Sequence, residues 1–360
     1  MTVADPQVSV VIPCHTLERT QHLTRAVASA LAQHPAPAEV VVSVDHNDAL
    51  ADFARSTLTG VTVVTNEYAR GVSGNRNTGV AHTGTPLVAL LDDDAYAHPG
   101  WLAGLVGPFE DLRVIGSGGA IVPIWESPRP SWFPDEFLWA VGGSYTGMPT
   151  MTARVRNVWS ASMAVRRTAF EAVGGFRVGF GKVGDRARPE DTDLCLRMSK
   201  ATGGTWMYVP QSRIDHPVPT ARTTLRFFLG RCFNEGRGKV EMGRLNDGRE
   251  SLDSERDYLR KTLPKAVGRG VAATLRGQGA ANAGRAVAVL AGMCAAAAGG
   301  AVETLRPHRP ADPSVAPDLP VAPGLPAASD LSAAPDLPAG SDFPAAPSLP
   351  AENASVGERA

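Results

Sequence analysis

The sequence predicts an α/β protein with a mostly parallel central sheet flanked by helices, followed by a helical extension and a disordered tail. Continuous β-branched runs alternate with helical segments over residues 8–91, which is typical of parallel strands covered on both faces. The tail follows from composition. From Pro310 onward the chain is a loose Ala-Pro-Asp-Leu repeat, too rich in proline and too poor in aromatics to pack.

The alternation also sets the order of the elements. The run VSVVIP predicts a buried strand, and EVVVSVD, VTVVT and PLVALL predict three more. Right-handed crossover helices should join them, so the carboxyl ends of the strands meet at one edge, where such sheets bind ligands. The predicted strands are 8–13, 39–45, 61–65 and 86–91, and the predicted helices are 18–33, 48–58 and 75–83.

Beyond these elements the pattern is less regular. VWSASMAV and TWMYVP predict strands, RRTAFEAVGGF predicts a helix that stops at glycine, and RPEDTDLCLRMSK predicts a helix that begins after its proline. Residues 125–149 carry tryptophans among many prolines and glycines. They form either a loop folded back over the sheet or an aromatic wall for a sugar or lipid acceptor. The candidate acceptor residues are Trp125, Trp132 and Trp159.

Composition divides the chain into three predicted parts: a catalytic-type α/β domain at 1–220, a helical extension at 221–306 and a disordered tail at 307–360. From Pro310 onward the tail holds seven acidic residues against one arginine, so the formal net charge of −1 leaves about +5 on the rest. That balance suits an anionic small ligand or an acidic membrane face. It lacks the dense basic stripe that nucleic-acid binding needs.

The predicted location is the cytoplasm. The four cysteines have no CxxC spacing, which indicates a reducing compartment, and strand-like sequence by Val8 leaves no signal peptide. Residues 286–302 are uncharged but short and made mostly of Ala and Gly, so a soluble or surface-lying helix is favoured over a span. Arg-rich amphipathic segments within 220–285 suit either ordinary packing or contact with anionic lipid. Together they suggest a peripheral site at the inner face of the cell membrane.

Three adjacent aspartates, Asp92, Asp93 and Asp94, directly follow the last predicted strand of the parallel set. Because neighbouring carboxylates repel one another, this position needs a cation. Oxygen ligands suit Mg²⁺ or Mn²⁺, which typically combine one or two protein carboxylates with phosphate oxygens. The run therefore indicates a metal–diphosphate site, with a capped turn at a strand end as the alternative.

Other polar residues should reach the same edge. Pro13, His15 and Asp45 lie at or just past predicted strand ends. The segment RGVSGNRNTGV offers glycines for close backbone approach and Arg70 and Arg76 for an anion, or else it is a polar loop with a helix cap. No P-loop is present and no GxGxxG follows the first strand, which excludes the usual NTPase and dinucleotide sites.

A second acidic centre lies at Glu190 and Asp191, in the first turn of a predicted helix. The helix dipole favours ionised carboxylates there, so Asp191 is a candidate general base, and helix capping is the alternative. His216 follows the strand-like run TWMYVP and is either a structural residue or a ligand.

These motifs together resemble the family 2 glycosyltransferases of GT-A fold. The resemblance rests on PCH, Asp45, GVSGNRNTGVA, LLDDDAYAHPGWL, VGGF and PEDTDLCLR, and it covers roughly residues 7–220. The runs GGAIVPIWESPRPSWFPDEFLWAVGGSY and RCFNEGRGK further resemble a bacterial subgroup named by analogy to glucuronosyltransferases that act on lipid-linked sugars. The chain departs from the family at His15 and Thr16, where Tyr-Asn is common, which puts the contacts to the nucleobase in doubt.

The resemblance implies a metal-dependent, hexosyltransferase-type enzyme. It would move a sugar with inversion from a nucleotide-diphosphate sugar to the hydroxyl of a saccharide or lipid-linked saccharide, in cell-surface glycan or lipid-linked saccharide synthesis. One alternative is a sugar nucleotidyltransferase, which would need an early glycine-rich loop with a lysine. A second is a non-catalytic binding protein of the same fold.

The resemblance also assigns roles to residues. Asp191 would be the catalytic base with Glu190 beside it, and Arg76 would stabilise the leaving diphosphate. The metal ligands for Mg²⁺ or Mn²⁺ would be Asp94, Asp92 and His216, and the nucleotide-sugar ligands Pro13, His15, Asp45, Arg76, Asp92 and Asp93.

Overall fold

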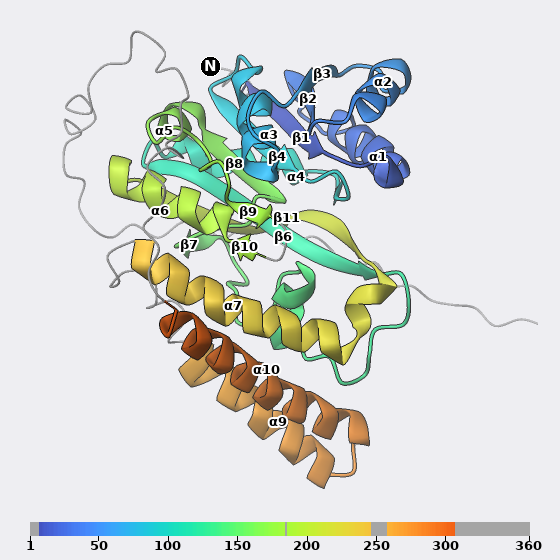
Figure 1. Cartoon of the computed structure of the whole chain (residues 1–360), viewed down its shortest axis with the longest axis vertical. Helices are drawn as coiled ribbons and strands as arrows, with labels where there is room; N and C mark the ends of the chain where they lie inside the picture. Colours follow the sequence, from blue (N-terminus) through green and yellow to red (C-terminus); the bar gives the residue numbers. More distant parts are fainter. Residues whose placement is uncertain (1–6, 184–185, 246–257, 307–360) are drawn as a thin grey trace, which may run out of the picture. The chain divides into compact units, whose positions relative to one another are not determined.

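A nine-stranded sheet forms the centre of the described chain, in the order β3-β2-β1-β4-β8-β6-β11-β5, with β7 paired to β11 (Figure 1). The computed structural model describes residues 7–183, 186–245 and 258–306, all within one compact unit. The tail predicted for 307–360 lies outside the described residues. The proposed division into domains at 220 and 306 stays a prediction.

The first half of the sheet is parallel, as the sequence predicts. Val11 of β1 pairs with Val41 of β2 and Leu90 of β4, and Val42 of β2 pairs with Val63 of β3. All seven residues of β1 are buried, which fits a central strand with helices on both faces. The bounds are β1 Val8–Cys14, β2 Glu39–Val44, β3 Thr62–Thr65 and β4 Leu87–Leu91.

The second half mixes directions. β8 runs antiparallel between β4 and β6, while β6 and β11 run parallel to each other. The expectation of a mostly parallel sheet is confirmed, and the antiparallel strands are an addition to it. The bounds are β5 Tyr96–Ala97, β6 Val114–Trp125, β7 Ala153–Val155, β8 Ser162–Arg166 and β11 Thr205–Val218, with β9 Gly181–Val183 and β10 Arg186–Arg188 in a separate two-stranded ribbon.

Helices cover both faces of the sheet with separate cores. Leu23 of α1, Leu50 of α2 and Trp101 of α4 belong to one buried cluster, whereas Phe170 of α5 and Leu194 of α6 belong to the other. The bounds are α1 Thr20–Leu31, α2 Asp48–Thr57, α3 Val72–Ala81, α4 Trp101–Val106, α5 Arg167–Glu171 and α6 Glu190–Thr202. Short helical turns lie at η1 Leu17–Arg19, η2 Gly107–Glu110, η3 Asp135–Val141, η4 Thr220–Thr223 and η5 Tyr258–Thr262.

Helix α3 begins earlier than the sequence indicates, at Val72 and not near residue 75. Gly71 precedes it with a φ of 143°, a conformation that glycine adopts readily. Most of α3 is buried although its sequence is polar. A Cβ added to Gly79 would lie 2.3 Å from Cγ1 of Val11, so this helix packs almost directly on the backbone of the sheet.

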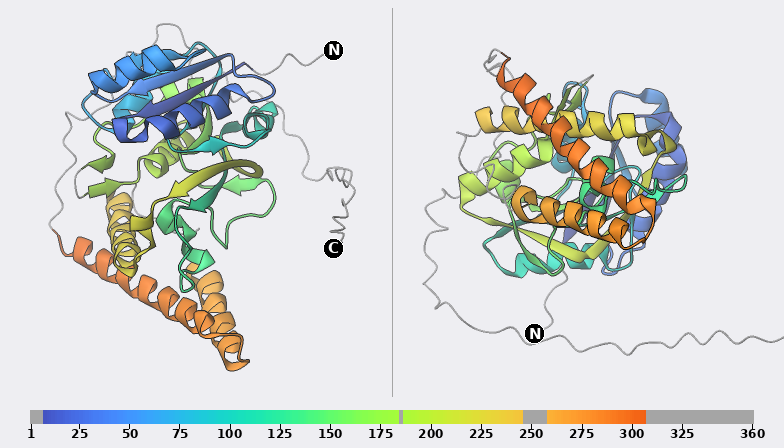
Figure 2. Two further views of the ribbon diagram at one scale, coloured as in Figure 1. Left: turned by 90° about the vertical axis from the view of Figure 1, so that its right-hand side faces the viewer. Right: turned by 90° about the horizontal axis from the view of Figure 1, so that it is seen from below.

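The helical extension is present. Helices α7 Leu225–Leu245, α9 Leu263–Leu275 and α10 Ala280–Thr304 bury a third cluster around Phe133, Phe137 and Phe228. Helices α7 and α10 cross at very short range. A Cβ added to Gly299 would lie 1.9 Å from the carbonyl oxygen of Phe233. In both views of Figure 2, α10 lies beside α7 and α9.

Among the described residues, α10 is the one helix that is long and apolar enough to cross a membrane. The mean hydropathy of its most apolar 18-residue stretch is 1.7, and 28% of that stretch is buried. A core helix of a soluble protein meets the same criteria, so length and composition alone do not decide between the two.

The close crossing of α7 and α10 makes a test of the extension. Gly299→Ala should lower the free energy of unfolding by about 1–3 kcal/mol, because the added methyl group meets a backbone carbonyl that cannot move independently. Gly268→Ala, in α9 with nothing within 4 Å of its added Cβ, should instead leave stability unchanged or raise it by up to about 1 kcal/mol. Denaturant unfolding measures both, and equal effects would contradict the crossing.

Candidate active site

The carboxyl ends of β1, β2 and β4 bring the predicted residues to one edge of the sheet. His15 follows β1 and is exposed, Asp45 follows β2, and the three aspartates follow β4. Pro13 lies inside β1 with its ring buried, opposite Ser43. Of the residues expected at the nucleobase, Pro13 therefore shapes the strand and His15 presents its ring to solvent.

Asp45 is buried and held from two directions. Its Oδ1 accepts a hydrogen bond of 2.7 Å from Nδ2 of Asn66, and its Oδ2 accepts one of 2.9 Å from the backbone N–H of Gly71. Gly71 directly precedes α3, so the carboxylate of Asp45 lies at the amino-terminal end of this helix. Arg70 donates to the carbonyl oxygen of His46 at 2.9 Å, so it joins the two loops at the rim and does not point at the aspartates of β4.

Helix α3 fixes the neighbouring strand ends through its buried amides. Nδ2 of Asn75 donates to the carbonyl oxygens of Cys14 and Ser43, at 3.2 and 2.9 Å. Two residues further along α3, Asn77 donates to the carbonyl oxygen of Phe176 and accepts from the N–H of the same residue, both at 2.8 Å. These contacts align the loops that carry the acidic residues.

Arg76 joins the two acidic centres. Its Nη2 lies 2.8 Å from Oδ1 of Asp92 and its Nη1 lies 3.0 Å from Oε1 of Glu190, and its side chain is only 4% exposed. Burial alone would lower the pKa of Arg76, but the two carboxylates raise it above its usual value. The sequence places Arg76 on the diphosphate. The structure places both terminal nitrogens on carboxylates, which makes Arg76 a positioning residue.

Asp93 and Asp94 share a different arginine. Nη1 of Arg19 lies 3.1 Å from Oδ1 of Asp93 and 2.9 Å from Oδ2 of Asp94. Burial, and then repulsion from Asp94, raise the pKa of Asp93 to about 7, while Arg19 opposes this shift. Oδ2 of Asp93 is buried without a hydrogen-bond partner in the described structure.

His216 faces the same aspartates. It lies within β11, not after the strand as the sequence indicates, because β11 continues through residue 218. Its Nε2 lies 3.6 Å from Oδ1 of Asp94, and its buried Nδ1 has no partner among the described residues. The described residues contain no group of three or more His, Cys, Asp or Glu side chains that could hold a metal. Asp94 and His216 fit an ion whose remaining ligands come from phosphate oxygens, as Mg²⁺ and Mn²⁺ often have.

Asp191 stands in the first turn of α6, beside Glu190. Its Oδ1 accepts a 2.7 Å hydrogen bond from the N–H of Thr192. Burial, and then the charge of Glu190, raise the pKa of Asp191 to about 7, with a smaller contribution from Glu235 of α7. A carboxylate with a pKa near neutrality is suited to accept a proton from a hydroxyl group.

Two arginines of the site were missed by sequence reasoning. Arg19 lies in an ordinary-looking helix start, and no spacing links it to residues 93 and 94. Arg222 lies in η4 and is partly buried. Burial lowers its pKa, while Asp94 acts to raise it. Its guanidinium makes no ion pair within the described residues, so it is a cation near the aspartates with free donors.

The predicted aromatic wall is divided in the structure. Trp132 packs on Phe133 and Phe228 inside the third buried cluster, while Trp159 packs near Tyr145 on the first. Trp125 packs edge-on to Phe133 and also lines a small pocket. The three rings are therefore not one surface, and their role toward an acceptor stays a prediction. That pocket is lined by His22, Arg25, Tyr96, Ile124, Trp125, Glu126, Asp215 and Pro217.

Comparison with known proteins agrees with these motifs. The profile "Glycosyl transferase family 2" matches residues 9–174. The glucosyl-dolichyl phosphate glucuronosyltransferase of Haloferax volcanii is 32% identical over 263 residues, which are 71% of this chain and 83% of that protein. The chain belongs to glycosyl transferase family 2. The predicted family, and its resemblance to glucuronosyltransferases of lipid-linked sugars, are confirmed.

More distant relatives cover less of the chain. The succinoglycan biosynthesis protein ExoM of Rhizobium meliloti is 28% identical over 46% of this chain and 50% of its own length. A pre-mycofactocin glycosyltransferase of Mycobacterium tuberculosis is 30% identical over 48% of this chain and 34% of its own. A crystal structure of GalNAc-T7 with UDP, GalNAc and Mn²⁺ superposes with a TM-score of 0.47 at 18% identity, covering 71% of this chain and 56% of that one.

Family membership settles the class of protein. The fold is the GT-A fold that the sequence predicts, and the protein is an inverting glycosyltransferase that uses a nucleotide-diphosphate sugar. The alternative of a sugar nucleotidyltransferase is set aside, because the matching family and the relatives above are glycosyltransferases or act in glycan synthesis.

The bridge through Arg76 gives a prediction about stability. Arg76→Met should lower the free energy of unfolding by about 3 kcal/mol, because it leaves Glu190 and Asp92 without their buried cation. Arg113→Met is the matched control, since Arg113 pairs with Asp111 at the surface and its loss should leave stability unchanged. Chemical denaturation measures both variants. An Arg76→Met protein as stable as the control would show that the bridge contributes nothing.

Proposed function

We propose that this protein is a metal-dependent glycosyltransferase whose acceptor is a lipid-linked saccharide at the cytoplasmic face of the membrane. The observation that carries the proposal is the bridge through Arg76, which holds Asp92, on the donor side, at a fixed distance from Glu190 and Asp191, on the base side. The relatives from Haloferax volcanii and Rhizobium meliloti, named for a dolichyl phosphate-linked sugar and for succinoglycan synthesis, support the acceptor class.

The nucleotide end of the donor is assigned to the loops after β1 and β2. Hydrogen bonds from Asn66 and Gly71 hold the carboxylate of Asp45 at this end of the sheet. His15 is exposed at the end of the neighbouring strand β1. Asp93 and Asp92 lie one strand away and are assigned to the ribose and the donor sugar. The base-side contact at His15 is the point at which this chain differs from the common family pattern.

Asp94 and His216 are the residues that would hold Mg²⁺ or Mn²⁺. A bound divalent ion would stabilise negative charge on the leaving diphosphate. Arg19 neutralises Asp93 and Asp94 from the side of β1, and Arg222 brings a further cation toward Asp94 from η4. We assign Arg222 to the diphosphate, because its guanidinium has donors that no described residue uses.

Asp191 carries out the proton transfer. Its carboxylate removes the proton from the acceptor hydroxyl as that oxygen bonds to the anomeric carbon, while the bond from this carbon to the diphosphate oxygen breaks on the opposite face. Direct displacement inverts the configuration. Glu190 is held by Arg76, and burial together with the neighbouring Glu190 raises the pKa of Asp191 to about 7.

The base assignment predicts a loss of rate. Asp191→Asn should lower kcat by about 10²–10⁴-fold with little change in donor binding, because Asn cannot accept the proton. Asp193→Asn is not a useful control, since Asp193 is buried between Arg177 and Arg197, but Asp52→Asn at an exposed position of α2 is. Release of the nucleotide diphosphate in the presence of acceptor measures the rates. Wild-type turnover in Asp191→Asn would remove it as the base.

Replacing Asp191 should affect stability and rate in opposite directions, and its effect on stability should depend on pH. The pKa of Asp191 is about 7 in the folded chain, against an ordinary value of 3.8 for an aspartate side chain. Ionisation in the folded state therefore lowers the free energy of unfolding, fully so above pH 7. Asp191→Asn should therefore raise the melting temperature, and by more at about pH 8 than at about pH 5. Thermal unfolding at the two pH values measures the difference, and an equal shift at both would contradict the raised pKa.

The metal assignment predicts a coupled loss. In wild type, one nucleotide sugar should stabilise the protein in the presence of Mn²⁺ by about 2–3 kcal/mol at a hundredfold excess over its dissociation constant. Asp94→Asn should lose the dependence on Mn²⁺, while Asp52→Asn, at an exposed surface position, should keep it. A thermal-shift panel of donors with and without Mn²⁺ measures this. Equal stabilisation by a donor with chelator present would contradict a metal-dependent site.

A further inference from the structure

We propose that α9 and α10 together form a surface that rests on an anionic lipid bilayer without spanning it. The proposal deepens the membrane location given above, and it rests on the function only in that a lipid-linked acceptor would gain from it. The surface itself is defined by residues that take no part in the chemistry of the site.

The exposed side of α10 is a continuous apolar stripe. Val287, Leu290, Cys294, Ala301 and Leu305 recur at intervals of three, four or seven residues, so they lie along one side of the helix, and all are exposed. Val287 is 65% exposed and Leu290 is 49% exposed. Helix α10 has 25 residues, so the stripe is roughly 30 Å long. An apolar stripe of this length with no charged residue in it is unusual for a face that meets only water.

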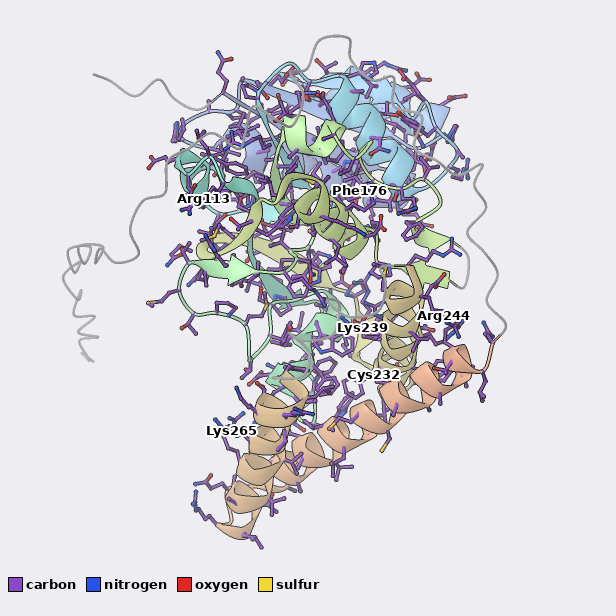
Figure 3. The ribbon with its side chains drawn as sticks, turned by 90° about the vertical axis from the view of Figure 1, so that its left-hand side faces the viewer. Arg113, Phe176, Cys232, Lys239, Arg244 and Lys265 are labelled. Carbon is purple, nitrogen blue, oxygen red and sulfur yellow. The ribbon has the colours of Figure 1, made fainter. Side chains whose placement is uncertain are left out.

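The exposed side of α9 adds apolar residues with basic ones beside them. Val271 and Leu275 lie one turn apart, and Leu275 is 83% exposed near the turn that joins the two helices. Lys265 and Arg276 lie three turns apart on a neighbouring side of α9 (Figure 3 labels Lys265). Within the described residues, neither makes an ion pair.

The charge of residues 258–302 indicates which partner the surface of α9 and α10 binds. From residue 258 to residue 302 the chain holds six Lys or Arg and no Asp or Glu. Basic residues beside exposed apolar ones match an anionic bilayer, where the apolar side chains enter the boundary region and the cations meet headgroups. A second copy of the chain would bring the same basic residues against each other, since a two-fold interface pairs each surface with itself.

The packing of α10 argues against a span. Its opposite side is clamped onto α7, where Gly236 and Gly299 allow backbone contact, and Glu303 pairs with Arg237 at 3.0 Å. If α10 crossed the bilayer, α7 would enter the hydrocarbon with its charges, which costs several kcal/mol for each unpaired one. Seen from below in Figure 2, α9 and α10 lie in front of the rest of the described chain, where a flat surface can reach them.

This arrangement also places the bilayer one helix away from the chemistry. Helix α7 contacts α10 on one side. On another side, Glu241 of α7 pairs at 2.8 Å with Arg188 of β10, which comes two residues before Glu190 in the sequence. The diameter of a helix is about 10 Å, so the head of a lipid-linked saccharide has a short path from the membrane to Asp191.

The test is vesicle flotation with the full chain. The probes are vesicles of phosphatidylcholine alone and of equimolar phosphatidylcholine and phosphatidylglycerol, with no donor or acceptor present. Wild type should float with the anionic vesicles only, and added salt should weaken binding because it screens the basic residues. A double variant with Leu275→Asp and Leu290→Asp should bind at least about tenfold more weakly, since one change puts a carboxylate among the exposed apolar residues of α9 and the other puts one into the stripe of α10.

The matched control is Leu112→Asp, because Leu112 is 81% exposed and lies outside the extension, between η2 and β6. It should bind as wild type does, and melting temperatures should show that all variants fold. No flotation of wild type, or equal flotation of the double variant, would overturn the proposal. So would a concentration-dependent dimer that the double variant abolishes, or binding that resists high salt and alkaline washing as a span does. Donor turnover in solution is measured separately, so failure of the surface and failure of the proposed activity are distinguishable.

Discussion

The buried guanidinium of Arg76 is the interaction on which the site depends. It lies between Asp92, which ends the parallel half of the sheet, and Glu190, which opens α6 nearly a hundred residues later. Each carboxylate would be costly to bury alone, and the shared cation stabilises both. Because two N–H groups on one rigid plane fix two acids, the distance between the metal side and the base side is set by the arginine.

The carboxylates around this bridge differ in the arginine that pairs with them. Asp92 and Glu190 both pair with Arg76, whereas the pKa of Asp191 is raised because it is partly buried and lies against Glu190. Asp93 and Asp94 take their counter-charge from Arg19 on another strand end. These five carboxylates thus have three electrostatic settings, which suits a reaction that needs both a place for a leaving anion and a base.

Sequence patterns gave the parallel strands, the order of the helices and the acids at their ends, because hydrophobic period and strand-end polarity are local properties. They did not give the direction of β8, which depends on pairing between β4 and β6, or the partners of Arg76. Arg19 and Arg222 were missed for the same reason: an arginine carries no local sign of which distant carboxylate it faces. Composition alone also did not place Trp132 in the third buried cluster, because an exposed wall and a buried aromatic cluster look alike in composition.

The buried amides of α3 have a consequence for how variation in this family is read. Asn77 donates to and accepts from the backbone of Phe176, as a neighbouring strand would, in a loop where no strand pairs. Asn75 closes the ends of β1 and β2 in a similar way. A mutational scan would score both as indispensable, side by side with Arg76, although the amides of both bond to backbone groups of the fold. Intolerance to substitution along α3 therefore reports on the geometry of the loops as much as on the chemistry of the site. Of Asn75, Arg76 and Asn77, only Arg76 connects the loop geometry with the acidic residues of the site.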